Sequence, residues 1–277
     1  ANITATNFAA GGICGFMVNG CGTIKDCENY GNVKAMTYAS GICGGSQSGK
    51  SITTYNYLIE DCLNSGKLST TNGVGSAGIA GSYSGAIKNC NNNGNVDDTQ
   101  GTAKSKLYTA GIVSCASFAV DIEGCYNRGA ISGVKNVGGI VGNVMKGDEA
   151  ATVIKNCRND GSVSGQDMYV AGIAANSARN EGVVSVVSCT NNGEVTSTGT
   201  TEFIGNLRGN TTIALGEGNI IGAGLKALPL DPAKETGIDN TNVNTGNTTN
   251  GVFLRNGQIV IVKNNKKYTI SGIEIAE

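Results

Sequence analysis

One pattern of hydrophobic and polar positions recurs six times along the chain. Each copy reads hydrophobic residue, two variable residues, Cys, any residue, Asn, any residue, Gly, any residue and a second hydrophobic residue. The Cys, Asn and Gly are present in every copy, and the copies span 24–33, 59–68, 87–96, 122–131, 154–163 and 186–195. A repeat of this kind, with a period near 32 residues, predicts a solenoid.

Each repeat unit holds three short hydrophobic stretches. The first is a Gly-Ile phrase, the second runs from the first hydrophobic residue to the Cys, and the third is the Gly-x-Val stretch. All are short and bounded by Gly, Asn or Ser, which favours strands over helices. The sequence therefore predicts an all-β chain folded as a parallel β-helix of about six to seven coils. The isoleucines of the Gly-Ile phrase are Ile13, Ile42, Ile79, Ile112, Ile140 and Ile173.

Equivalent residues of successive coils should lie about 4.8 Å apart and form ladders. We expect the Cys side chains to pack inside as small hydrophobes. We expect the Asn residues to sit where the chain turns, to tolerate left-handed geometry and to bond one another along the axis. The Gly that follows would supply a positive φ or a close backbone approach. The ladder residues are Cys27, Cys62, Cys90, Cys125, Cys157 and Cys189 with Asn29, Asn64, Asn92, Asn127, Asn159 and Asn191.

Disulfides between adjacent coils are the alternative for these cysteines, because the expected Cα separation lies within disulfide range. Cys14 and Cys43 also stack in adjacent coils and carry the same two interpretations. Cys21 and Cys115 fall outside the ladders, so we expect them to be the more reactive thiols.

The repeat ends after Val195, and the remaining sequence changes character. We assign 1–225 to the β-helix, 226–250 to a polar linker and 251–277 to a small antiparallel meander. The last segment alternates hydrophobic and polar residues, and Asn256-Gly257 and Asn264-Asn265 favour tight hairpin turns.

Composition narrows the function classes. The 277 residues contain no His, which excludes Ser/His/Asp hydrolysis, Cys/His proteolysis and His-based metal sites. The ten cysteines lack a C-x-x-C spacing, so we expect no metal and no cofactor. A net charge of −1 argues against nucleic acid as a partner. No apolar run is long enough for a membrane helix, and no signal peptide is visible, so the chain is either cytosolic or processed.

The Gly-Ile phrases resemble the GLUG-type repeat of bacterial surface proteins. The copies that carry the resemblance are Gly12-Ile13-Cys14-Gly15, Gly41-Ile42-Cys43-Gly44, Gly78-Ile79-Ala80-Gly81 and Gly139-Ile140-Val141-Gly142, while Ser114 and Ala175 replace the last Gly elsewhere. Such repeats occur in adhesin-like proteins and in the non-catalytic part of some immunoglobulin A peptidases. The resemblance implies a right-handed β-helix located outside the cell. The tail from Asn256 to Gly272 resembles the C-terminal segment of exported Bacteroidetes proteins and implies the same location.

Acidic clusters offer little for catalysis. A glycosidase needs two carboxyl groups about 5–9 Å apart. The clusters are Asp97-Asp98, Asp121 with Glu123, and Asp148-Glu149; Asp121 and Glu123 flank an inward Ile122 and should both point outwards. Lys104 and Lys106 near Asp97-Asp98 are the nearest approach to a polysaccharide lyase site. We assign no catalytic residue.

Tyrosines are the candidate ligand-binding residues, because an exposed tyrosine ring can stack on a sugar. Tyr38, Tyr108 and Tyr169 each precede the isoleucine of a Gly-Ile phrase by four residues, and Tyr55 and Tyr57 lie in the longest insertion. The alternative is that these rings only shield the sheet edge. We expect a monomeric, non-enzymatic surface or secreted protein that binds a host or dietary glycan or a glycoprotein. A polysaccharide lyase or glycoside hydrolase on the same scaffold, and a passive stalk, are the alternatives.

Overall fold

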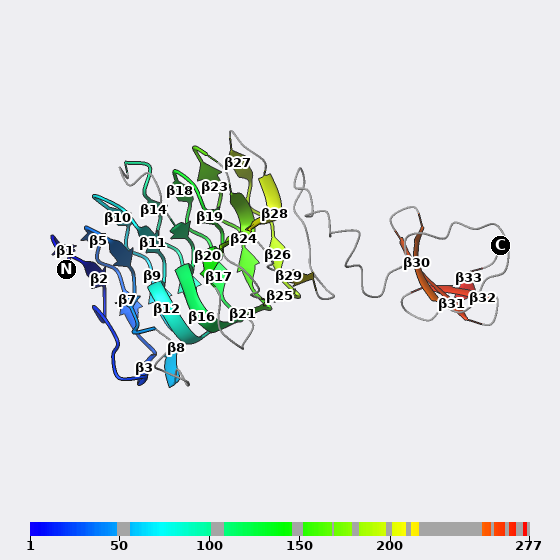
Figure 1. Ribbon diagram of the computed structural model, residues 1–277, viewed down its shortest axis with the longest axis horizontal. Helices are drawn as coiled ribbons and strands as arrows, with labels where there is room; N and C mark the ends of the chain where they lie inside the picture. The colour runs from blue at the N-terminus through cyan, green and yellow to red at the C-terminus, as the bar shows by residue number, and fades with distance from the viewer. Residues whose placement is uncertain are drawn as a thin grey trace. The chain divides into compact units, whose positions relative to one another are not determined.

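The structure is a computed structural model, and it shows an all-β parallel solenoid (Figure 1). It describes residues 1–48, 56–100, 108–145, 152–167, 169–178, 183–197, 201–208, 212–215, 251–255, 258–263, 266–269 and 274–275. The chain divides into two compact units, residues 1–228 and 229–277. The predicted linker at 226–250 and the turn residues of the predicted meander lie outside the described residues.

The six Gly-x-Val stretches and residues 3–5 near the N-terminus form a seven-stranded parallel sheet. Its strands pair in register, so that Val33 lies beside Ile3 on one side and Leu68 on the other. Alternation places these hydrophobic residues inside and their neighbours outside. The strands, in spatial order, are β1 (Ile3–Ala5), β5 (Val33–Ala35), β10 (Leu68–Thr70), β14 (Val96–Asp97), β18 (Ile131–Gly133), β23 (Val163–Gly165) and β27 (Val195–Ser197).

The other two hydrophobic stretches join into one sixteen-stranded sheet with two arms. The arm that precedes the Gly-Ile phrase comprises β2 (Ala9–Gly11), β6 (Tyr38–Ser40), β11 (Gly75–Ala77), β15 (Tyr108–Ala110), β19 (Val137–Gly138) and β24 (Val170–Ala178). The arm that follows it comprises β3 (Cys21–Lys25), β7 (Cys43–Gly45), β8 (Asn56–Glu60), β12 (Ala80–Lys88), β16 (Val113–Glu123), β20 (Val141–Met145), β21 (Thr152–Lys155), β25 (Val183–Val187), β28 (Thr201–Arg208) and β29 (Thr212–Leu215).

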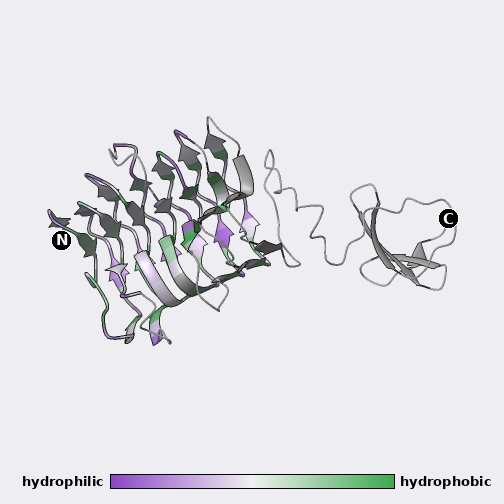
Figure 2. Ribbon diagram, viewed as in Figure 1, coloured by the Kyte–Doolittle hydropathy of each residue, from purple (hydrophilic) through white to green (hydrophobic). Residues whose placement is uncertain are grey.

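A third, six-stranded sheet is formed by the two residues that follow each repeat Cys, the second of which is the Asn. Each strand has two residues, and Figure 2 shows short purple, hydrophilic arrows in the solenoid, such as the strand that Figure 1 labels β17. The strands are β4 (Glu28–Asn29), β9 (Leu63–Asn64), β13 (Asn91–Asn92), β17 (Tyr126–Asn127), β22 (Arg158–Asn159) and β26 (Thr190–Asn191). Our expectation that Asn itself sits in a left-handed turn was wrong. The left-handed residue is the one just before each Cys: Asp26, Asp61, Asn89, Gly124, Asn156 and Ser188, with φ between 50° and 63°.

The core consists of hydrophobic ladders, as the repeat predicted. Ile59, Ile87, Ile122 and Ile154 pair in register and are all fully buried. Each buried side chain of this size contributes on the order of 1.5–3 kcal/mol to folding before entropy is subtracted. A second cluster, which includes Val33, lies behind the seven-stranded sheet. Together the two clusters fill the interior of the solenoid.

The cysteine ladder lies in the first core cluster, and all ten cysteines are free thiols. Cys27 is half-buried and the other ladder thiols are buried. Each ladder thiol after Cys27 points back one coil: Cys125 Sγ, for example, lies 3.7 Å from the carbonyl oxygen of Ile87. Burial raises the pKa of the Cys125 thiol, because the thiolate would lose its hydration.

The asparagine ladder bonds along the solenoid axis, as predicted. Asn64 Nδ2 donates to Asn92 Oδ1 at 2.8 Å, and Asn92 Nδ2 donates to Asn127 Oδ1 at 2.8 Å. The same Nδ2 of Asn92 also donates to the carbonyl oxygen of Gly94, two residues on. The ladder therefore satisfies the hydrogen-bonding capacity of the buried side-chain amides and also stabilises the turn between the Asn and the Gly.

The C-terminal unit contains the predicted antiparallel meander. Its four strands pair in sequence order: β30 (Gly251–Arg255), β31 (Gln258–Lys263), β32 (Lys266–Thr269) and β33 (Glu274–Ile275). Alternating hydrophobic and polar residues favour such two-faced strands.

Candidate binding groove on the seven-stranded sheet

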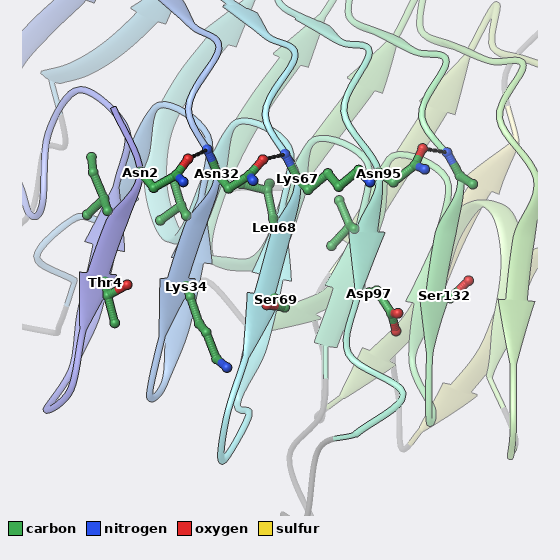
Figure 3. A pocket seen from close by; sticks show the side chains of 14 residues that line it. Asn2, Thr4, Asn32, Lys34, Lys67, Leu68, Ser69, Asn95, Asp97 and Ser132 are labelled. Carbon is green, nitrogen blue, oxygen red and sulfur yellow. Dashed lines mark hydrogen bonds between the residues drawn. The ribbon is translucent and has the colours of Figure 1, made fainter.

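The outer face of the seven-stranded sheet carries a groove of about 540 Å³ (Figure 3). It crosses β1, β5, β10, β14 and the start of β18. Neighbouring parallel strands are about 4.8 Å apart, so the groove extends roughly 19 Å along the solenoid axis. Its lining residues are Asn2, Ile3, Thr4, Asn32, Val33, Lys34, Lys67, Leu68, Ser69, Asn95, Val96, Asp97, Ala130 and Ser132.

The groove is polar because side chains along each strand alternate between the buried face and the solvent face. In β5, Val33 and Ala35 are buried and Lys34 between them is exposed. The same alternation in every coil produces two outward rows, one on each side of the buried hydrophobic row. Figure 3 shows one row as Asn2, Asn32, Lys67 and Asn95, and the other as Thr4, Lys34, Ser69, Asp97 and Ser132.

The asparagine row is fixed by bonds to the next coil. Asn2 Oδ1 accepts from the backbone N–H of Asn32 at 3.1 Å, and Asn32 Oδ1 accepts from that of Lys67 at 3.0 Å. Asn95 Oδ1 accepts from the backbone N–H of Ala130 at 3.0 Å. Because the carbonyl oxygen of each amide is occupied, its NH2 group is directed outwards. Within the described part of the chain these three NH2 groups donate to no protein acceptor.

Three charged side chains line the groove. Lys34 and Lys67 are exposed, and neither makes an ion pair with an acid among the described residues. Asp97 is exposed, and its Oδ1 accepts from the backbone N–H and the hydroxyl of Thr99 at 3.0 and 2.7 Å. The groove therefore offers amide, ammonium and hydroxyl donors together with one carboxylate.

Asp98 lies on the opposite side of the strand from Asp97 and is only 1% exposed. Its Oδ1 accepts from the backbone N–H and hydroxyl of Thr70 and from the hydroxyl of Ser76, at 2.8–2.9 Å. Its Oδ2 accepts from the hydroxyl of Thr109 at 3.3 Å. Burial raises the pKa of this carboxyl, and the four hydrogen bonds only partly oppose that effect. Asp97 and Asp98 face opposite ways, so they do not form a catalytic pair.

The tyrosines of the predicted edge do share one column. Tyr38 and Tyr108 both pair with Gly75, and Tyr169 follows one coil after Asn136. All three are half-buried rather than fully exposed. The Tyr38 ring contacts Phe8 with centroids 6.3 Å apart, and burial raises the pKa of its hydroxyl. Whether this column binds a glycan stays a prediction.

Tyr57 is not a surface residue, so our expectation for it was wrong. It is 1% exposed and packs against Tyr83, with ring centroids 6.4 Å apart. Its hydroxyl accepts from the backbone N–H of Gly20 at 2.7 Å. The residues after the insertion re-enter the core as β8, and period-two alternation turns Tyr57 inwards. Tyr55 lies outside the described residues.

The other candidate cysteines, acids and lysines agree with the predictions only in part. Cys21 is exposed, as expected, but Cys115 is buried, and burial raises its pKa. The expectation that Cys115 is reactive was therefore wrong. Glu123 forms an ion pair with Lys155 at 3.2 Å, while Asp121 is exposed beside the buried Ile122. Asp148-Glu149, Lys104 and Lys106 lie outside the described residues.

The described residues contain neither a cluster suited to a metal ion nor a helix suited to crossing a membrane. No group of three or more His, Cys, Asp or Glu side chains among them is placed to hold a metal ion. None of their elements is a helix of the length and apolar character that crossing a membrane requires.

Sequence reasoning missed the groove. The signal was present in the residues on either side of the inward Val position, which are polar in every copy except at Ala130. Such residues are also ordinary for any solvent-facing strand. Only the stacking of five coils shows that they line one continuous depression.

Comparison with known proteins supports the fold and leaves the family open. No family model matches the sequence, and no curated protein matches it. The GLUG resemblance therefore remains a prediction. A similar solved structure is described as a "putative immunoglobulin A1 protease" from Bacteroides ovatus, with a TM-score of 0.53 and 21% sequence identity. The similarity covers 77% of this chain and 66% of the neighbour, so this chain spans less than two thirds of the neighbour's length. At this identity the likeness shows that the two proteins share the β-solenoid fold.

Proposed function

We propose that this protein is a non-enzymatic binding module whose groove on the seven-stranded sheet holds an extended, hydroxyl-rich polymer, a glycan carried free or on a glycoprotein. The observation that carries the proposal is the pair of polar rows, which repeat in register from coil to coil (Figure 3). A linear polymer presents equivalent groups at regular intervals, and a solenoid presents equivalent partners in the same way.

The chemistry of the rows suits sugar hydroxyls, which both donate and accept hydrogen bonds. The amide NH2 groups of Asn32 and Asn95 and the ammonium group of Lys67 supply donors, and Asp97 supplies an acceptor. The groove is open and wet, so each exchanged hydrogen bond contributes little net free energy, about 0.5–1.5 kcal/mol. We therefore expect modest affinity for a single short glycan.

The lining itself favours binding over hydrolysis. Hydrolysis of a glycosidic bond uses two carboxyl groups on either side of the bond. Asp97 is the one acid among the described lining residues, and its neighbour Asp98 is buried behind the sheet. A surface or secreted location agrees with this proposal, because burial shields the ladder thiols from oxidation.

A blocking substitution tests the site. Ser69 lies in the outward row between Lys34 and Asp97, and Ser69→Ile would fill the middle of the groove with a side chain that strands accept readily. Ser65→Ile, beside β9 on the six-stranded sheet, is the matched control. A glycan-array screen of the wild type, followed by titration of the hits, should show binding that Ser69→Ile removes and Ser65→Ile retains.

The other outcomes separate the alternatives. Glycan binding that survives Ser69→Ile would show that the groove is not the site. Loss of glycan binding in a Tyr108→Ala/Tyr169→Ala variant with an unchanged melting temperature would instead place the site at the tyrosine column. Release of reducing sugar from a hit would show the carbohydrate-active enzyme. Absence of any glycan hit would contradict the proposal and favour the alternative in which the protein is a passive stalk.

A further inference from the structure

We infer that the groove selects a glycan that carries carboxylate groups and holds it in one orientation, with a carboxylate between Lys34 and Lys67 and a hydroxyl group donating to Asp97. The inference rests on the proposed function and adds to it the class of sugar and the direction in which the chain lies.

Lys34 and Lys67 occupy positions close enough to share one anion. Asn32 pairs with Lys67 across the β5–β10 boundary, and Lys34 pairs with Ser69, two residues further along. The two lysines are thus diagonal neighbours on the same outward face, with Cα atoms about 8 Å apart from sheet geometry. In Figure 3 the two side chains extend in different directions, and rotation about their long stems would bring both ammonium groups to a carboxylate between them. Because neither has an acid partner among the described residues, binding an anion breaks no existing ion pair.

Asp97 lies on the far side of Lys67 from Lys34, as a diagonal neighbour of Lys67 across the β10–β14 boundary. Two strand intervals separate it from Lys34, or about 10 Å, with Ser69 between them. Among the described residues Asp97 forms no ion pair with Lys34 or Lys67, so all three charges remain available to a ligand. Thr99 occupies Oδ1 of Asp97 and leaves Oδ2 as an acceptor. A carboxylate at this end would be repelled, whereas a hydroxyl group would donate.

The balance of hydrogen-bond donors and acceptors in the groove also favours an acidic sugar. The amides of Asn2, Asn32 and Asn95 present donors, because their oxygens are bound to backbone N–H groups. Together with the two ammonium groups, donors exceed acceptors in the groove. A neutral sugar offers hydroxyl groups that can meet this surplus only with their lone pairs, while an acidic sugar adds two strong acceptor oxygens.

The local charge also contrasts with the chain as a whole. The protein has a net charge of −1, while the described lining carries two lysines and one aspartate. Attraction of an anionic glycan must therefore be local, and at physiological salt it should weaken over distances of about 8 Å. We expect the affinity for an acidic glycan to fall as salt is raised, and the affinity for a neutral glycan to stay nearly constant.

The test compares an oligogalacturonate with its fully methyl-esterified form, which has the same backbone without charge. Calorimetric titration should give at least tenfold weaker binding of the ester by the wild type. The Lys34→Ala/Lys67→Ala variant should lose this preference, and Lys88→Ala, at a β12 position outside the groove, should keep it. Asp97→Asn should bind the oligogalacturonate a few-fold more tightly, because it removes the repulsive carboxylate.

Each contrary result has a distinct meaning. Equal binding of acid and ester, abolished in both cases by Ser69→Ile, overturns the acidic-sugar inference and keeps the groove. A preference for the acid that survives Lys34→Ala/Lys67→Ala overturns the assignment of its site. Failure of every glycan to bind, acidic or neutral, removes the proposed function as well. Thermal unfolding of each variant would show that these exposed substitutions leave the solenoid folded.

Discussion

The side chain of Asn92 fills the space beside Gly78. A methyl group on Gly78 would overlap Cγ of Asn92 as well as the carbonyl oxygen of Gly111. The first Gly of the Gly-Ile phrase and the Asn of the Cys-x-Asn phrase therefore depend on each other, although they lie in separate parts of the repeat. The same contact recurs in the next coils, where Gly111 faces Asn127 and Gly139 faces Asn159.

Gly78→Ala should consequently destabilise the solenoid. The added methyl group meets backbone and a hydrogen-bonded amide, neither of which can move freely, and overpacking of this kind costs about 1–3 kcal/mol or more. Urea unfolding would measure the loss in the free energy of unfolding. Gly15→Ala is the control, because open space surrounds that glycine, and its effect should stay within about 0.5 kcal/mol. Equal effects of the two substitutions would contradict the steric account.

Asn92→Asp should be more damaging than its small change in shape suggests. The new carboxylate oxygen would face the carbonyl oxygen of Gly94 and Oδ1 of Asn127, both of which are acceptors. A buried, uncompensated charge of this kind costs about 3 kcal/mol or more. Asn93→Asp, one residue away and exposed, should be tolerated, because the side chain there already accepts from Arg128. Similar melting temperatures for the two variants would argue against the ladder.

Thiol accessibility should follow burial. Cys21 is exposed and should react with a thiol reagent in the native protein, as should the half-buried Cys14 and Cys27. The buried cysteines should react only after unfolding, since burial both blocks access and raises the thiol pKa at Cys115 and Cys125. Titration in denaturant without reductant should then count about ten thiols. A count below about eight would show disulfides between coils.

Asp98 should make stability depend on pH in an unusual direction for an aspartate. Its pKa is raised by burial, so the folded chain holds the proton more tightly than the unfolded chain. This stabilisation is complete below the unfolded pKa of about 3.9 and is lost as the pH rises through the folded pKa. Asp98→Asn lacks the effect, so its stability relative to the wild type should rise from pH 4 towards neutrality. Each unit of pKa difference corresponds to about 1.4 kcal/mol.

Asp97→Asn is the matched control for that experiment, because Asp97 is exposed next to Asp98. Its stability relative to the wild type should show no comparable rise with pH. Unfolding curves measured in denaturant at several pH values would give the comparison. A flat difference for Asp98→Asn as well would contradict the burial of its carboxylate.

The strict repeat made the ladders predictable, because every copy places Ile, Cys and Val at the same offsets and in-register stacking follows from sheet geometry. The residue that adopts the left-handed turn conformation was harder to predict. Asn has a strong turn preference, and this obscured the more varied residue before Cys, which is Asp, Asn, Gly or Ser and adopts the left-handed conformation in each copy. Tyr57 was misplaced for a related reason: an insertion resets the alternation, and its register is decided by the neighbouring coil.

The sequence by itself determined the parallel solenoid, the core ladders and the axial bonding of the asparagines, since each depends on residues that recur at a fixed period. The tertiary structure decided which side chains meet between different parts of the repeat. It placed Gly78 against Asn92, turned Asp98 inwards and Asp97 outwards, and aligned Lys34, Lys67 and Asp97 in one groove. The physical reason is that these contacts cross from one coil to the next, so they depend on how unequal loops return the chain to register.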